Sequence, residues 1–272
     1  MNPNDVREQV SRAYTEALSK SRGNEGGCCG GGPAPQSAAA RLAGYEQEAA
    51  LHGEAASASF GCGNPLAFSG VTPSQTVLDL GSGAGLDLLI ASDRVGPAGR
   101  VIGIDMTDAM LDAARAAAGR EGRTNIELRR GLIEDLPVDD QSVDWVISNC
   151  VINLSPDKPK VFAEIRRVLR PGGRFSISDI VVESLPDWLR THAAAYAACI
   201  GGAISEAEYL RGLAAAGLSD LRVEGRTVYD ADQLAAITAG EQELLGLDRK
   251  TLDQTLAELA GQVWSAQFTG RR

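Results

Sequence analysis

The residues best suited to chemistry in this sequence are five cysteines, and their positions distinguish them. Cys28 and Cys29 are adjacent in a segment rich in glycine and proline, which predicts a loop that can move. Cys62 lies in a Gly-Cys-Gly-Asn-Pro turn, Cys150 follows an apolar strand-like run, and Cys199 precedes two glycines. A lone cysteine is most often a small buried apolar residue, but thiols beside turns fit that role less well.

Three separate thiols suit a soft trivalent ion better than they suit zinc. Zinc signatures contain Cys-x-x-Cys pairs and four ligands, and Cys62, Cys150 and Cys199 show no such pairing. Thiolates are the ligands that soft ions select. As(III) takes three of them and keeps a lone pair, so these thiols are candidates for holding As(III).

A second set of residues predicts a nucleotide-binding corner. Val77–Leu80 is a buried strand by its apolar run, and the segment 81–85, Gly-Ser-Gly-Ala-Gly, turns sharply into a helix. Asp105 ends the next expected strand, where a carboxylate can accept hydrogen bonds from ribose hydroxyls. Leu86 stands where the NAD fingerprint needs its third glycine, so that dinucleotide is disfavoured.

The elements that would position these residues alternate between strand and helix. Apolar patterning predicts strands at Thr76–Leu80, Arg100–Ile104, Ile126–Arg130, Val143–Ser148 and Arg174–Ile180. Helices between them make this an α/β chain with a Rossmann-like, mostly parallel sheet covered on both faces. Ser205 and Glu208 have the spacing of a capping box, and Leu221–Val228 predicts a further strand.

The remaining segments surround this sheet. We expect an amphipathic helix over 5–22, a helix over 193–204 and a helical pattern over 230–268. The predicted organisation is an N-terminal extension of helices and Cys-containing loops (1–70), a cofactor-binding domain (71–184), a segment that completes the sheet and the thiol site (185–229), and a small α-rich C-terminal region (230–272).

Composition limits the possible partners. The chain has 272 residues and a formal net charge of −10, with no compensating basic run, which argues against binding to nucleic acid or an anionic membrane. The N-terminus has no apolar signal region, and the longest apolar run, 193–204, is too short to span a bilayer. We therefore expect a soluble cytoplasmic protein in which the cysteines are not structural disulfides.

The corner resembles the first motif of class I S-adenosylmethionine-dependent methyltransferases over about residues 70–182. The resemblance implies that Asp79, Gly81, Ser82 and Gly83 hold the methionine part of the cofactor and that Asp105 binds the ribose. It places the adenine between Met106 and Ile133, with Glu134 or a backbone group accepting from its amino group. We include Asn149, after the fourth strand, in the same site.

A narrower resemblance follows from the turn at Cys62, the segment Ser148–Lys158 and the Cys-Ile-Gly-Gly segment at Cys199, which together are similar to arsenite S-adenosylmethionine methyltransferases. That family implies methyl transfer to As(III) or methylarsenite, delivered as glutathione or other thiol conjugates, for arsenic detoxification. Cys62, Cys150 and Cys199 would bind As(III). Cys28 or Cys29 would exchange disulfides with Cys62, which glutathione or thioredoxin would reduce, and the protein would be a monomer.

Three other functions remain open on the sequence. An antimonite methyltransferase would use the same thiols, because thiolates bind both ions. Another small-molecule C- or O-methyltransferase would leave the cysteines unexplained. A thiol-based metalloid sensor would bind the ion without turnover.

Overall fold

The computed structural model describes residues 2–23, 45, 51–59, 61–67, 69–192, 195–196, 199–237 and 249–272. Cys28 and Cys29, with the expected mobile loop, lie outside these residues. The expected helix over 5–22 is confirmed as α1 (Pro3–Gly23).

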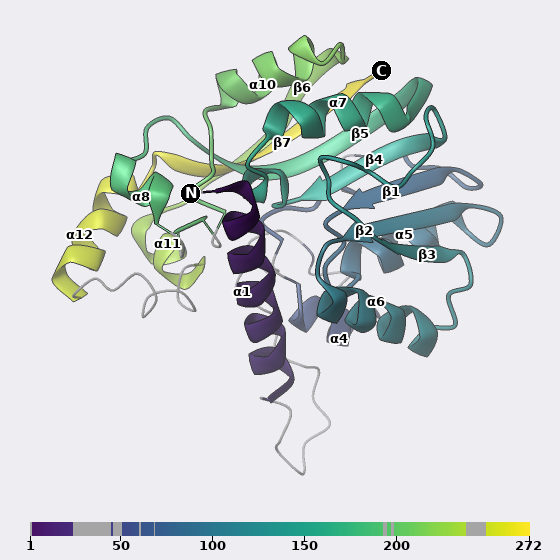
Figure 1. Cartoon of the computed structure of the whole chain (residues 1–272), viewed down its shortest axis with the longest axis horizontal. Coiled ribbons are helices and arrows are strands. Elements are labelled where there is room, and N and C mark those ends of the chain that lie inside the picture. Colours follow the sequence, from purple (N-terminus) through teal and green to yellow (C-terminus); the bar gives the residue numbers. More distant parts are fainter. Residues whose placement is uncertain are drawn as a thin grey trace.

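Within the described residues, seven strands form one sheet in the order β3-β2-β1-β4-β5-β7-β6 (Figure 1). Strands β1 to β5 are parallel to one another, and β7 is antiparallel to both β5 and β6. Their bounds are β1 Thr76–Leu80, β2 Arg100–Asp105, β3 Ile126–Arg130, β4 Val143–Asn149, β5 Leu169–Val182, β6 Ser219–Val228 and β7 Val263–Arg271. The predicted parallel α/β sheet is therefore confirmed.

Helices cover both faces of the sheet, as the alternation predicts. Helices α5 (Leu86–Val95) and α6 (Asp108–Arg120) pack apolar side chains on β1 and β2. On the opposite face, α7 (Lys158–Val168) and α10 (Glu206–Ala215) pack on β4, β5 and β7. The expected capping box begins α10, where the Ser205 side chain accepts from the Glu208 amide.

A separate apolar cluster lies beyond the carboxyl ends of β4 and β5. It brings together side chains from α1, α8 (Asp187–Thr191), α11 (Ala231–Ile237) and α12 (Arg249–Leu259). In Figure 1, α8, α11 and α12 lie together at the left of the view, and α1 runs down near the centre. The cluster contains Cys62, Cys150 and Cys199, so the fold gathers three cysteines that are far apart in the sequence. The 3₁₀ helix η1 (Ile152–Leu154) adds Leu154 to this cluster, whereas the short helix α4 (Gly53–Ser57) packs Ala55 and Ala56 in the cluster of α5 and β1.

Two predicted segments are wrong in detail. Residues 263–268 were expected to be helical, but they belong to β7, which pairs with β5 along its length. Tertiary pairing overrides a local pattern here, because Val263, Trp264, Ala266 and Phe268 are all buried in the sheet. In the expected helix over 193–204, the described residues 195–196 are helical, but 199–204 form turns, a bend and irregular chain.

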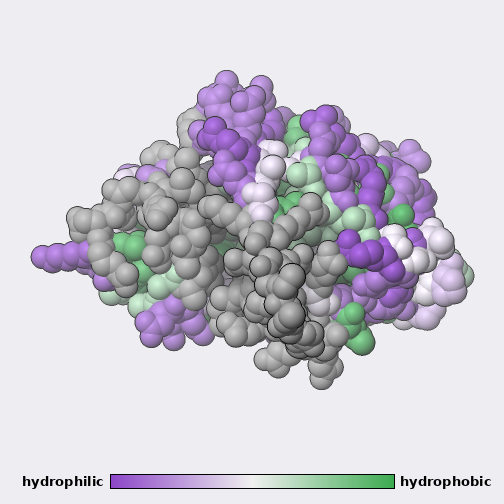
Figure 2. Space-filling view, turned by 90° about the horizontal axis from the view of Figure 1, so that it is seen from below, coloured by the Kyte–Doolittle hydropathy of each residue, from purple (hydrophilic) through white to green (hydrophobic). Residues whose placement is uncertain are grey.

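The face seen from below in Figure 2 is mostly hydrophilic outside the grey atoms, with hydrophobic residues interspersed. Among the described residues, none of the helices combines the length and apolar character that crossing a membrane requires.

Candidate active site

The glycine turn after β1 leaves its backbone open to a ligand. Gly81 has φ +65° and Gly83 has φ +51°, both in the left-handed region. A Cβ on Gly81 would lie 2.4 Å from a methyl group of Val151, so a side chain there would collide with the loop after β4. A Cβ on Gly83 would meet no heavy atom within 4 Å. The turn is therefore tight on one side and faces an open pocket on the other.

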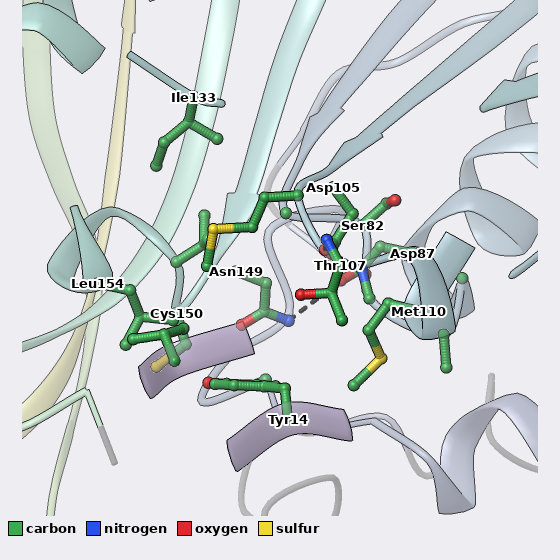
Figure 3. Close-up of a pocket in the computed structure, with 18 of the residues that line it drawn as sticks. Tyr14, Ser82, Asp87, Asp105, Thr107, Met110, Ile133, Asn149, Cys150 and Leu154 are labelled. Carbon is green, nitrogen blue, oxygen red and sulfur yellow. Dashed lines mark hydrogen bonds between the residues drawn. The ribbon is translucent and has the colours of Figure 1, made fainter. Parts of the chain in front are cut away.

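Asp105, at the end of β2, holds this turn to the next loop. Its carboxylate accepts from the Gly83 amide at 3.0 Å and from the Thr107 amide at 2.8 Å. Burial raises the pKa of Asp105, and these hydrogen bonds to the ionised form oppose the rise. The side chain lines the pocket between the turn and α6 (Figure 3). The carboxylate thus ties the glycine turn to the loop before α6.

Asp87 and Asp105 line the pocket, and the buried carboxylate of Asp79 on β1 is close enough to both for their charges to act on it. Asp79 is 2% exposed, and one of its carboxylate oxygens has no hydrogen-bond partner. Burial, then the charges of Asp87 and Asp105, raise the pKa of Asp79. Among the described residues that line the pocket, Arg7 is the one basic side chain, and Glu134 pairs with it at 3.1 Å. A positively charged ligand would relieve this repulsion.

Where the sequence predicts the adenine to bind, the pocket has an apolar wall, and the carboxylate there already has hydrogen-bond partners. Met106 and Ile133 both line the pocket. Glu134 also lines it, but one carboxylate oxygen accepts from both Arg7, at 3.1 Å, and Ser155, at 2.8 Å. The carboxylate expected to meet an amino group is therefore already held by α1 and by the chain after η1.

Asn149 holds the Cys62 turn rather than pointing freely into the pocket. Its side-chain oxygen accepts from the Gly63 amide at 3.2 Å, and its nitrogen donates to the Gly63 carbonyl at 2.7 Å. The same nitrogen also lies 2.8 Å from the Tyr45 hydroxyl and 3.1 Å from a carboxylate oxygen of Asp87, both of which can accept from it. Figure 3 shows Asn149 and Asp87 side by side in the pocket. Asn149 thus connects the cysteine turn to the carboxylate end of the pocket. Tyr45 and Asp87 in this network were missed by the sequence analysis.

The cysteines meet at the far end of this pocket. Cys150 lines the pocket, and its sulfur is bonded to that of Cys62 in a disulfide. Cys199 is a free thiol that donates to the Cys150 carbonyl at 2.8 Å. All three are buried, and burial raises the pKa of the Cys199 thiol to about 12. The expectation that the cysteines form no structural disulfide is therefore wrong for Cys62 and Cys150. The expected exchange of Cys62 with Cys28 or Cys29 stays a prediction, because those two residues lie outside the described ones.

Two of these cysteines have an unusual backbone. Cys150 has φ +58° and Cys199 has φ +60°, in the left-handed region that disfavours residues with a Cβ. Such conformations cost on the order of 1–3 kcal/mol and gather at functional sites. The turns at Cys150 and Cys199 aim both side chains into the same apolar cluster, together with Cys62.

Asp179 is a buried carboxylate that the sequence analysis did not select. On β5, it lies with the sulfurs of Cys62 and Cys150 in a group whose ligand atoms are all within 4.8 Å. It accepts from the Ile180 amide at 3.0 Å and from the Tyr209 hydroxyl at 3.2 Å. Burial raises its pKa to about 7, and the positive charge of Lys158 opposes the rise. The sequence signal that could have identified Asp179 is that it is the single charged residue in the run 175–182.

We expect Asp179→Asn to flatten the pH dependence of stability. The folded pKa of Asp179 is about 7, against an ordinary value of 3.8. Between about pH 4 and 7 the folded chain retains a proton that the unfolded chain has lost, so this group lowers the free energy of unfolding as pH rises. Thermal melts of the oxidised protein from about pH 5 to 8 should show Tm falling less in the variant than in the wild type.

The matched control for this measurement is Asp112→Asn, on a side chain that is 74% exposed. It should keep the wild-type slope of Tm against pH. Parallel slopes for the wild type and Asp179→Asn would show that Asp179 carries no proton that folding retains.

Comparison with known proteins places the chain among methyltransferases. Residues 72–217 match a family model described as a methyltransferase domain. The arsenite methyltransferase of Halobacterium salinarum is 40% identical over 214 residues, which cover 74% of this chain and 54% of that protein. The arsenite methyltransferase of Homo sapiens is 38% identical over 164 residues, covering 57% and 43%. The chain thus spans about half the length of these curated relatives.

A solved structure extends the similarity over most of the chain. The X-ray structure of an arsenic(III) S-adenosylmethionine methyltransferase from Chlamydomonas reinhardtii superposes with a TM-score of 0.62 and is 33% identical. The match covers 88% of this chain and 74% of that one.

Proposed function

Because the chain belongs to the arsenite S-adenosylmethionine methyltransferase family, we propose that it methylates As(III) held by its own thiols. The observation that carries this proposal is the meeting of Cys62, Cys150 and Cys199 at one end of a pocket whose other end is a glycine turn with buried carboxylates. The physiological role would be arsenic detoxification.

The pocket residues fit S-adenosylmethionine as the methyl donor. When bound, it supplies a methyl group on a positively charged sulfonium. The carboxylates of Asp79, Asp87 and Asp105 favour a cation, and the unpartnered oxygens of Asp79 and Ser82 are suited to its polar groups. Asp105 would take the ribose, with Met106 and Ile133 against the adenine. Gly81 and Gly83 would leave the backbone accessible.

The thiols would hold the acceptor. We propose that As(III) arrives as a conjugate of glutathione or another thiol, and that Cys150, Cys199 and Cys62 replace its thiol ligands one by one. Each exchange transfers the proton of a protein thiol to the departing thiol, so no separate base is required. What the chain contributes is position and a buried, water-poor environment.

The Cys62–Cys150 disulfide must be opened before this site can form, because two of its three sulfurs are bonded to each other. Glutathione or thioredoxin would reduce it, with Cys28 or Cys29 as a candidate exchange partner. We further propose that the protein acts as a cytoplasmic monomer and that residues 185–229 complete the acceptor side.

The proposal is tested by incubating the reduced protein with As(III) and S-adenosylmethionine and analysing the products for methylated arsenic. A parallel reaction with Sb(III) decides between the two ions. As(III) binding without methylated product would favour a sensor. Methylation of organic acceptors alone would indicate another small-molecule methyltransferase.

We expect turnover to depend on a thiol reductant. Oxidised protein assayed with As(III) but without glutathione, thioredoxin or dithiothreitol should yield no methylated arsenic, while its affinity for S-adenosylmethionine should stay within about twofold. Adding the reductant should restore product formation. Equal turnover with and without reductant would show that the disulfide does not close the site.

A further inference from the structure

Helix α1 lines the pocket through Arg7, Val10 and Tyr14, the last of which is drawn in Figure 3. Near its start, Arg7 pairs with Glu134 at 3.1 Å. One turn later, the Ser11 hydroxyl lies 3.1 Å from that of Thr107, beside Asp105. The next contact is different, because the Tyr14 hydroxyl lies 3.7 Å from the sulfur of Cys199. Arg7 and Ser11 thus meet the cofactor side, whereas Tyr14 meets the thiol side.

The two contacts of the Cys199 sulfur respond differently when it binds a soft ion. In the free thiol, the S–H donates to the Cys150 carbonyl at 2.8 Å. Once arsenic has replaced this proton, sulfur has nothing to donate and faces a carbonyl oxygen that is also an acceptor. The Tyr14 phenol can still donate to the sulfur. Loss of the proton therefore breaks one contact and leaves the other in place.

Tyr14 lies between the cysteines and the open pocket. It is partly buried against the apolar cluster that contains the cysteines, and it lines the pocket. In Figure 3 its hydroxyl is directed towards the end of the pocket where Cys150 lies. A donor fixed on a helix keeps its geometry better than one on a loop.

We propose that Tyr14 is a positioning residue for the acceptor, whose hydroxyl holds the Cys199 sulfur in place once As(III) is bound to it. This inference rests on the proposed function and adds to it that α1 forms part of the acceptor site. Tyr14 touches the sulfur and transfers no proton in this role.

The test is Tyr14→Phe, which removes the hydroxyl and keeps the ring. We expect the Kd of As(III) for the reduced variant, measured by calorimetry, and the KM for As(III) in turnover to rise about fivefold, the usual effect of losing one hydrogen bond. The Kd of S-adenosylmethionine and kcat at saturating As(III) should change less than about twofold. An unchanged Kd and KM for As(III) would overturn the assignment.

Two further variants separate this role from general loosening of α1. Thr15→Ala removes an exposed hydroxyl that bonds within α1, and it should leave both As(III) constants unchanged. Ser11→Ala removes a different α1 contact, on the cofactor side. If Ser11→Ala raises the Kd of As(III) as much as Tyr14→Phe does, the effect comes from helix docking and the assignment is wrong. Calorimetry measures As(III) binding without turnover, so it tests the role of Tyr14 independently of methylation. A wild type that forms no methylated arsenic would overturn the proposed function but not the assignment of Tyr14.

Discussion

Replacing Cys150 or Cys199 with serine is expected to lower kcat/KM for As(III) methylation by at least about 100-fold, since each removes a sulfur that would fix the acceptor. Serine keeps the size and the polar atom but is a poor ligand for a soft ion at neutral pH. The turns need no rebuilding, because serine can occupy the left-handed backbone of these cysteines as well as cysteine does. The measurement is the rate of methylarsenic formation at saturating S-adenosylmethionine.

Cofactor binding supplies the control for these variants. Cys199 does not line the cofactor pocket, so the Kd of S-adenosylmethionine in Cys199→Ser should match that of the wild type within about twofold. Thermal melts of the reduced proteins would show whether either variant is unfolded. Wild-type rates in both folded variants would rule out a site built on these thiols.

The second large effect is expected from Asp105→Asn, which should weaken S-adenosylmethionine binding by roughly 100-fold. The carboxylate is a double acceptor within the protein, from Gly83 and from Thr107, and would also accept from the ribose. An amide places an N–H group against one of those backbone N–H donors, so the turn is disturbed as well as the ligand contact. Losing charged hydrogen bonds worth about 3 kcal/mol corresponds to that factor.

Asp108→Asn is the matched control, because Asp108 begins the next helix and its side chain is 72% exposed. Calorimetric titration should give this variant the wild-type Kd for S-adenosylmethionine. As(III) binding to reduced Asp105→Asn should also be retained, since the thiols are at the other end of the pocket. A wild-type Kd for S-adenosylmethionine in Asp105→Asn would remove Asp105 from the cofactor site.

Patterns among residues close together in sequence predicted several strands, turns and helix starts correctly. The strand Thr76–Leu80, the carboxylate at position 105 and the capping box at Ser205 depend on residues close together in sequence, and the structure has them as expected. The glycine turn at 81–85 likewise follows from local backbone requirements.

Such local patterns could not predict the contacts between segments that are far apart in sequence. Tyr14 and Asp179 gain their significance only from neighbours brought close by folding, Cys199 for one and the Cys62–Cys150 pair for the other. The strand at Val263–Arg271 was missed for the same reason, since its partner β5 is far away in the chain. The cysteines were selected from their turns, but which two are bonded depends on tertiary distance.

The position of β7 also bears on synthesis of the chain. It lies between β5 and β6 in the sheet but follows both in sequence. During translation, β5 is an unpaired edge on that side until residues 263–271 have left the ribosome, and such edges invite pairing with other chains. β5 carries Asp179 and accepts the Cys150 amide hydrogen bond through Ser178. The edge of β5 that carries Asp179 is therefore completed only once residues 263–271 can pair with it.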